Sequence, residues 1–160
     1  MSVLPILLWP DPRLSQAAAP VGAVTEEIRS LAADMLETMY AAPGRGLAGP
    51  QVGAMLRLFV MDTDWTDGTP APRVFLDPEV LELSDETVEM TEGCLSIPDV
   101  TVTVTRPAAL RLAWTDLDGG RQSGALDGIA ARCALHELDH LDGLVHFDRL
   151  TPEARAEALA

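Results

Sequence analysis

Three residues in the last quarter of the chain have the types and spacing of a metal site. His136, Glu137 and His140 form the pattern H-E-x-x-H. On an α-helix, residues four apart share a face with Cβ atoms roughly 6 Å apart, so both imidazoles can bind one metal ion. Glu137 projects beside them and can take a proton from an attacking water. These residue types indicate metal-dependent hydrolysis; the alternative is a buried helix whose histidines only form hydrogen bonds.

A helix around this pattern is favoured by the flanking residues. Apolar side chains recur at helical spacing on both sides of the histidines, at Ile129, Cys133, Leu138 and Leu141. Asp127 can cap the start of this helix, and Gly143 is placed to end it. The spacing therefore predicts a helix between residues 127 and 143 that carries both histidines on one face.

A catalytic site of this kind needs a third protein ligand, and the sequence offers two candidates that imply different enzymes. His146 extends the pattern to H-E-x-x-H-x-x-G-x-x-H, which resembles the metzincin protease signature. Metzincins also need a methionine in a turn after the third histidine, whereas the last methionine here is Met90. Cys94 is the second candidate.

Length, composition and charge narrow the class of protein. We expect residues 1–160 to form a single domain, since this length suffices for a substantial core. No apolar run approaches the roughly 20 residues of a membrane span. The net charge of −14 argues against nucleic acid or an anionic membrane as partner. Two cysteines are too few for a disulfide scaffold, which favours a cytoplasmic location.

The other elements predicted from pattern are one further long helix and many short strands. The helix begins after a Thr25 cap, places Met35 and Met39 in the core and stops near Pro43-Gly44. Residues 44–51 form a glycine-rich loop that must approach another group closely. Strands are expected at 56–61, 74–76, 80–83, 87–90, 100–105 and 110–115, the last with a hairpin partner, and a short helix at 151–160. This is an α+β domain.

Three motifs in order along the chain resemble the signature motifs of the peptide deformylase family. They are Gly44-Arg45-Gly46-Leu47-Ala48-Gly49-Pro50-Gln51, Glu92-Gly93-Cys94-Leu95-Ser96 and His136-Glu137-Leu138-Asp139-His140. The resemblance implies antiparallel sheets around a central metal-binding helix. It also implies a metal ion on Cys94, His136 and His140, with Fe(II) expected and Zn(II) or Ni(II) able to occupy the same site. The implied reaction removes the formyl group from the N-terminal methionine of newly made peptides.

The same resemblance assigns roles to further residues. Glu137 acts as the general base. The side chain of Gln51 and the backbone N–H of Leu95 stabilise the oxyanion. The backbone of Gly46 binds the formyl amide. Glu92 and Arg106 form an ion pair that ties the Cys94 segment to its strand.

Three positions of the expected substrate site depart from the family. Arg45 and Arg132 stand where aliphatic residues usually form the methionine pocket, and Thr101 stands where Gly or Arg is common. Arg132 also lies one helical turn before His136. Either both arginines point outward or pair with acids and leave the pocket apolar, or the chain acts on a polar or acidic first residue or another small acyl group. A third reading is a binding protein that has lost activity.

Residues 151–160 indicate whether the chain docks on the ribosome. Family members that dock on the ribosome use a longer basic C-terminal helix, whereas residues 151–160 hold two Glu and one Arg. The resemblance therefore implies an N-formylated peptide as substrate, without ribosome docking.

Overall fold

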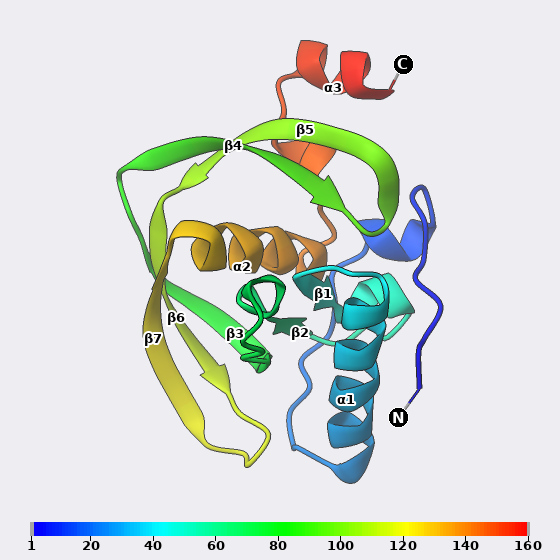
Figure 1. Cartoon of the computed structure of the whole chain (residues 1–160), viewed down its shortest axis with the longest axis vertical. Helices are drawn as coiled ribbons and strands as arrows, with labels where there is room; N and C mark the ends of the chain where they lie inside the picture. The colour runs from blue at the N-terminus through cyan, green and yellow to red at the C-terminus, as the bar shows by residue number, and fades with distance from the viewer. Residues whose placement is uncertain (1, 160) are drawn as a thin grey trace.

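The computed structural model of the chain describes residues 2–159. Helix α2 (Gly128–Leu141) lies at the centre, between two antiparallel sheets (Figure 1). It carries the H-E-x-x-H segment and ends before Gly143, whose φ of 79° is typical of a glycine that closes a helix. Asp127 occupies the N-cap position, but its side chain accepts no capping hydrogen bond, contrary to the prediction.

The larger sheet supports α2 from one side. Its strand order is β1 (Gly46–Ala48), β2 (Leu58–Met61), β3 (Arg73–Leu83), β6 (Ala109–Thr115) and β7 (Arg121–Asp127), with all neighbours antiparallel. All four residues of β2 are buried, as expected for a short apolar strand inside a sheet. The apolar side chains of this sheet and of α2 form one core cluster, which includes Phe59, Phe75, Leu112, Ala134 and Leu138.

The smaller sheet covers the opposite side of α2. It is a long hairpin of β4 (Thr87–Cys94) and β5 (Ile97–Pro107). The alternating Val and Thr residues of β5 put Val102 and Val104 in the core, as the period of two predicts. These valines pack with Val145 and Phe147, which flank or lie in the 3₁₀ helix His146–Arg149.

Helix α1 (Glu26–Ala41) covers the β1–β2 end of the larger sheet. Thr25 accepts a capping hydrogen bond from the N–H of Ile28, and Met35 and Met39 are fully buried, so both predictions for this helix are confirmed. Three more 3₁₀ helices lie at Pro12–Ser15, Gly49–Val52 and Trp65–Asp67. The last helix, α3 (Pro152–Leu159), projects from the body, and Thr151 caps it (Figure 1).

The predicted α+β class is confirmed, and two further local predictions, besides the Asp127 cap, were wrong. The strands expected at 74–76 and 80–83 are one strand, β3, interrupted by a register shift between Leu76 and Glu79. Residues 92–98 close the β4–β5 hairpin, with the turn at Leu95 and Ser96. The glycine-rich segment is only partly a loop, because Gly46–Ala48 pairs with β2.

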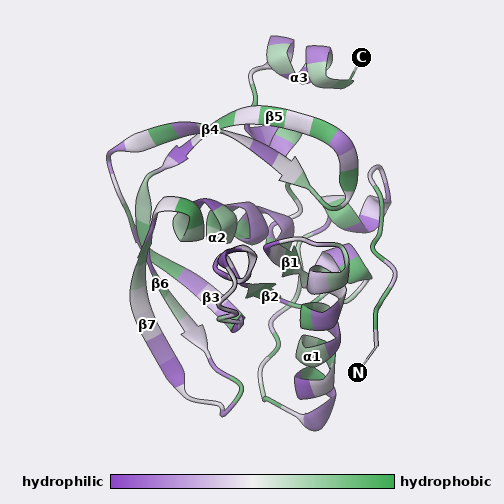
Figure 2. Cartoon of the chain, viewed as in Figure 1, coloured by the Kyte–Doolittle hydropathy of each residue, from purple (hydrophilic) through white to green (hydrophobic). Residues whose placement is uncertain are grey.

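Hydropathy along the ribbon reveals an unusual feature of the central helix. Figure 2 shows hydrophilic residues along α2 although both faces of the helix are covered. Five ionisable residues of α2 are buried: Arg132, His136, Glu137, Asp139 and His140. Buried ionisable groups need partners, so this helix marks the part of the fold where function is expected. Within residues 2–159 no helix combines the length and the apolar character needed to cross a membrane.

Candidate metal centre and active site

Three side chains from two elements converge beside α2. Cys94 ends β4, and His136 and His140 lie one turn apart on α2. The Nε2 atoms of the two histidines are 3.2 Å apart, and the Cys94 Sγ lies 3.4 Å from the His140 Nε2. One ligand atom from each residue lies within 4.8 Å of the others. Bond lengths of about 2.1 Å to nitrogen and 2.3 Å to sulfur give ligand separations of this size around one ion.

His146, the other candidate for third ligand, is outside this cluster. Its buried ring stacks edge-on between His136 and Phe147, with centroids 6.0 Å and 4.8 Å away. The arrangement brings together the ligand set with Cys94 and not the metzincin set. Burial is the main cause that lowers the pKa of His146, to about 4.

This buried histidine should make stability depend on pH. In the unfolded chain its pKa returns to about 6.5, so between pH 6.5 and 4 the unfolded state binds a proton that the folded state does not. The free energy of unfolding should therefore fall as the pH drops through this range. Between pH 7 and pH 5, the free energy of unfolding of His146→Leu should fall by roughly 1–2 kcal/mol less than that of the wild type. Urea titrations of both proteins in the presence of a chelator measure this difference. Parallel pH dependences for the two proteins would contradict this.

Glu92 holds His136 in place. Its Oε1 lies 3.0 Å from the His136 Nδ1, and three arginine contacts complete its surroundings: Arg106 Nε and Arg132 Nη1 each 2.6 Å from Oε2, and Arg106 Nη2 2.9 Å from Oε1. Burial alone would raise the pKa of Glu92, but these hydrogen bonds lower it, so the carboxylate is ionised. An ionised carboxylate only accepts, so Nδ1 of His136 must carry the proton and Nε2 keeps its lone pair for a metal.

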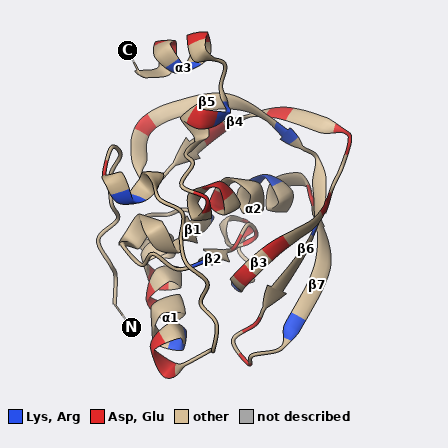
Figure 3. Ribbon diagram, turned by 180° about the vertical axis from the view of Figure 1, so that it is seen from behind, with Lys and Arg blue, Asp and Glu red and all other residues tan. Residues whose placement is uncertain are grey.

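The network extends to Asp139. Its Oδ2 accepts hydrogen bonds from Arg106 and Arg149, and its Oδ1 accepts a second bond from Arg149 at 2.6 Å. Asp139 is buried rather than facing solvent. Figure 3 shows acidic residues spread over the molecule with few basic ones, so it is notable that three arginines gather behind the metal ligands.

Glu137 lies on the pocket side of the ligands. It is 4% exposed, and its Oε1 is buried without a hydrogen-bond partner among the described residues. Burial raises its pKa to about 7. The backbone of Gly46 runs so close that a Cβ there would lie 2.6 Å from both the Glu137 Oε2 and the Cys133 Sγ. This close approach explains why the β1 segment needs glycine at that position.

Gln51 reaches the same centre from the other side. Its Oε1 accepts a bond from the N–H of Ala48 at 2.9 Å, which fixes the orientation of the amide. Its Nε2 then points to Ser96 Oγ at 3.1 Å and to the Cys94 Sγ at 3.8 Å. A buried donor is thereby held beside the metal ligands.

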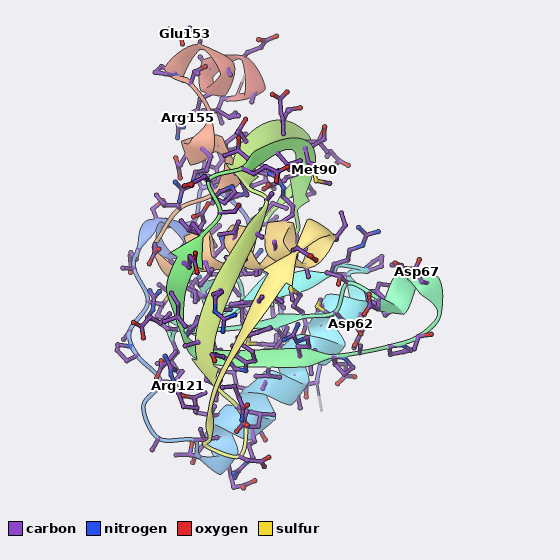
Figure 4. The ribbon with its side chains drawn as sticks, turned by 90° about the vertical axis from the view of Figure 1, so that its left-hand side faces the viewer. Asp62, Asp67, Met90, Arg121, Glu153 and Arg155 are labelled. Atoms are coloured by element: carbon purple, nitrogen blue, oxygen red, sulfur yellow. The ribbon has the colours of Figure 1, made fainter. Side chains whose placement is uncertain are left out.

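A cavity of about 550 Å³ opens onto Glu137. Figure 4 shows Met90 and the Asp62–Asp67 loop on the same side of the molecule, where the cavity lies beside the start of α2. Its wall includes both the catalytic candidates and apolar side chains: Leu95, Ile97, Val100, Ile129 and Met90. Asp62 positions the loop, since its carboxylate accepts bonds from Tyr40 and from the N–H groups of residues 64, 65 and 71.

The two unexpected arginines differ in their surroundings. Arg132 is buried and bonded to Glu92, so it pairs with an acid, as one of the two readings had it. Arg45 is exposed at the cavity and forms no ion pair with any described residue.

Thr101 is also exposed on the cavity wall, and Leu95 lies at the hairpin turn. The ten residues predicted from the sequence to act in metal binding, catalysis or substrate binding lie in or beside one site.

Sequence reasoning missed the contact between Glu92 and His136 and the pairing of Gln51 with Ser96. Both join residues more than 40 positions apart, and only the position of Glu92 and Ser96 inside the Cys94 motif hinted at them.

Comparison with known proteins agrees with this geometry. The model of the polypeptide deformylase family matches residues 3–156. A peptide deformylase of Acinetobacter baumannii is 47% identical, over 97% of this chain and 87% of that protein. One of Mesorhizobium japonicum is 46% identical, over 94% and 86%. The crystal structure of the Ehrlichia chaffeensis peptide deformylase in complex with actinonin has a TM-score of 0.92 and 37% identity, over 99% of this chain and 95% of that one. The chain therefore belongs to the polypeptide deformylase family.

Proposed function

We propose that Glu137, Gln51 and Leu95 remove the formyl group from the N-terminal methionine of peptides at a metal ion held by Cys94, His136 and His140. As a member of its family, the chain is a hydrolase that acts on N-formylated peptides and uses a single metal ion. The observation that carries the assignment of residues is the buried Oε1 of Glu137, which has no hydrogen-bond partner among residues 2–159 and lies beside the three converging ligand atoms.

The residues present fit a metal ion. A thiolate and two imidazole nitrogens with mutual contacts of 3.2 and 3.4 Å leave room for one small cation, and Glu92 holds the His136 tautomer that binding requires. A divalent ion there would act as a Lewis acid and make water a nucleophile at neutral pH.

Glu137 moves the proton. Its Oε1 is available because no described residue bonds to it, and its raised pKa brings it close to the operating pH. The carboxylate accepts a proton from the attacking water and passes one to the nitrogen of the leaving peptide. The carboxyl side chain is thereby returned to its starting state after each turnover.

Fixed donors surround the reacting carbonyl. Gln51 cannot turn, because Ala48 holds its Oε1, so its Nε2 is ready to donate to the developing oxyanion. We assign the second donor to the N–H of Leu95, next to Cys94 in the hairpin turn. The extended backbone of Gly46 binds the formyl amide. A side chain on this residue would collide with Glu137 and Cys133, so glycine is needed for the backbone to lie this close to the catalytic carboxylate.

The proposal also covers the identity of the metal ion, the cellular location and binding to the ribosome. We expect Fe(II), with Zn(II) or Ni(II) as substitutes, since one thiolate and two imidazoles suit all three ions. A cytoplasmic location fits a substrate made by the ribosome.

Helix α3 carries Glu153, Arg155 and Glu157, so we expect no stable docking on the acidic ribosomal RNA through it. Co-sedimentation with ribosomes at low salt tests this.

Formate release tests the function. Protein prepared without oxygen and loaded with Fe(II) should release formate from formyl-Met peptides. The matching acetyl-Met peptides are the comparison, and an enzyme specific for the formyl group should act on them much more slowly. A formyl-Glu series should show whether exposed Arg45 favours an acidic first residue. No formate from any formyl peptide by protein with one metal ion per chain would overturn the proposal.

A further inference from the structure

Arg132 is bonded to three residues of the β4–β5 hairpin. It is 8% exposed and lies one turn before His136 on α2. Its Nη1 donates to Glu92 Oε2 at 2.6 Å and to the Val104 carbonyl at 2.8 Å, and its Nη2 donates to the Val88 carbonyl at 2.5 Å. Val88 belongs to β4 and Val104 to β5. One guanidinium therefore joins the central helix to both strands of the hairpin.

The two elements that Arg132 joins are the two that carry metal ligands. Cys94 ends β4, whereas His136 and His140 are on α2. The distance between hairpin and helix thus decides whether the thiolate and the imidazoles can reach one ion. The hairpin is also linked to α2 by Glu92 of β4, which bonds His136, and by Arg106 of β5, which bonds Asp139.

Arg132 also fixes the orientation of Glu92. Arg106 bonds both carboxylate oxygens of Glu92 in a bidentate pair, and Arg132 adds a second cation on Oε2 alone. With Oε2 taken by two guanidinium groups, Oε1 remains for the Nδ1–H of His136. Loss of Arg132 would free the carboxylate to rotate or shift toward Arg106, and the imidazole would lose its fixed partner.

We propose that Arg132 is a positioning residue of the metal centre, which acts through Glu92 on His136 and through the hairpin on Cys94. The inference rests on the metal site proposed above. Arg132 also lines the cavity. Three of its five N–H donors nevertheless bond to other residues of the chain, so its role is to hold the site together rather than to bind substrate. Its guanidinium is buried and bonded to Glu92, which it shares with Arg106, so we expect no direct contact with an acidic substrate.

The test compares metal release and the metal's spectrum in matched variants. Wild type, Arg132→Leu and Arg132→Lys are loaded with Co(II), whose visible absorption reports on thiolate and imidazole ligands. Release to a chelator is then followed. We expect release about 10- to 100-fold faster from Arg132→Leu, the range typical when a partner behind a ligand is lost. We expect an altered Co(II) spectrum as well, and an intermediate effect for Arg132→Lys, which keeps the charge but not the three-way bridge.

Arg29→Leu is the matched control. Arg29 is also a helical arginine paired with a glutamate at 2.6 Å, but the pair is exposed and lies on α1. This variant should keep the wild-type spectrum and release rate. If Arg132→Leu does not fold, Arg132→Lys is compared with the wild type instead. Release of Co(II) from Arg132→Lys at the wild-type rate would overturn the inference.

A double-mutant cycle separates positioning from packing. Because Arg132 acts partly through Glu92, the Arg132→Leu change should speed metal release less in a Glu92→Gln background than in wild type, and the effect that remains is the one through the hairpin. Effects that multiply independently would overturn action through Glu92. A third result is that Arg132→Leu lowers only the stability of the protein and keeps the wild-type Co(II) spectrum and release rate. That result would show that Arg132 contributes packing alone and would overturn the inference. Failure of the wild type to bind one Co(II) per chain would instead contradict the metal site.

Discussion

Replacing Glu137 by Gln is expected to lower kcat for formyl-peptide hydrolysis by about 100- to 10,000-fold while metal binding stays at one ion per chain. The amide keeps the shape of the side chain but cannot accept a proton. Because Glu137 is buried and its Oε1 has no partner among the described residues, no neighbouring group can replace it. Formate release by the metal-loaded variant, with the metal content of the same sample, measures the effect.

The pH dependence of the wild type should agree with this role. Glu137 must be deprotonated to act, and burial raises its pKa to about 7. Activity should therefore decrease as the pH falls below 7. The exposed Glu89 of β4 provides the control, since Glu89→Gln should change neither activity nor metal content. Activity of metal-loaded Glu137→Gln above about a tenth of wild type would contradict the assignment of the general base.

Cys94→Ala is expected to lose the metal ion. Its Sγ supplies the third ligand atom, and His146, the alternative third ligand, is not part of the ligand cluster. The loss in affinity should exceed the roughly 100-fold that follows removal of a partner behind a ligand. Metal content after gel filtration, together with a competition titration against a chelator, measures it.

Cys133→Ala is the matched control, because Cys133 is the other cysteine and also lines the cavity. Its Sγ contacts the Arg45 carbonyl at 3.5 Å, and burial raises its pKa, so it remains a thiol rather than a metal-binding thiolate. This variant should keep one metal ion per chain. Equal metal retention by Cys94→Ala and Cys133→Ala would contradict the role of Cys94.

The elements that carry the site could be predicted where the signal is local. Helical spacing around His136 and the glycine at 143 give α2 nearly to the residue, because both signals lie within the helix. The alternation of Val and Thr gives the core of β5 for the same reason. The strand 73–83 was divided in two because its irregularity, between Leu76 and Glu79, arises from pairing with β6. Strand pairing is not visible in a local pattern.

The surroundings of Arg132 show where reasoning from sequence ended. Helical geometry placed it one turn before His136, but could not decide between a substrate contact and a pair with an acid. Its partners, Glu92 and the carbonyls of Val88 and Val104, lie 28 to 44 positions away. Their approach depends on how the hairpin packs on α2. The same holds for Glu92, whose ion pair with Arg106 could be predicted but whose bond to His136 could not.

A crystal of metal-loaded protein, with anomalous diffraction measured at the absorption edge of that metal, tests the account most directly. We predict one peak per chain, within about 2.5 Å of the Cys94 Sγ and of the Nε2 atoms of His136 and His140. A peak bound by His146 with the thiol of Cys94 turned away, or no peak between these three side chains, would contradict it.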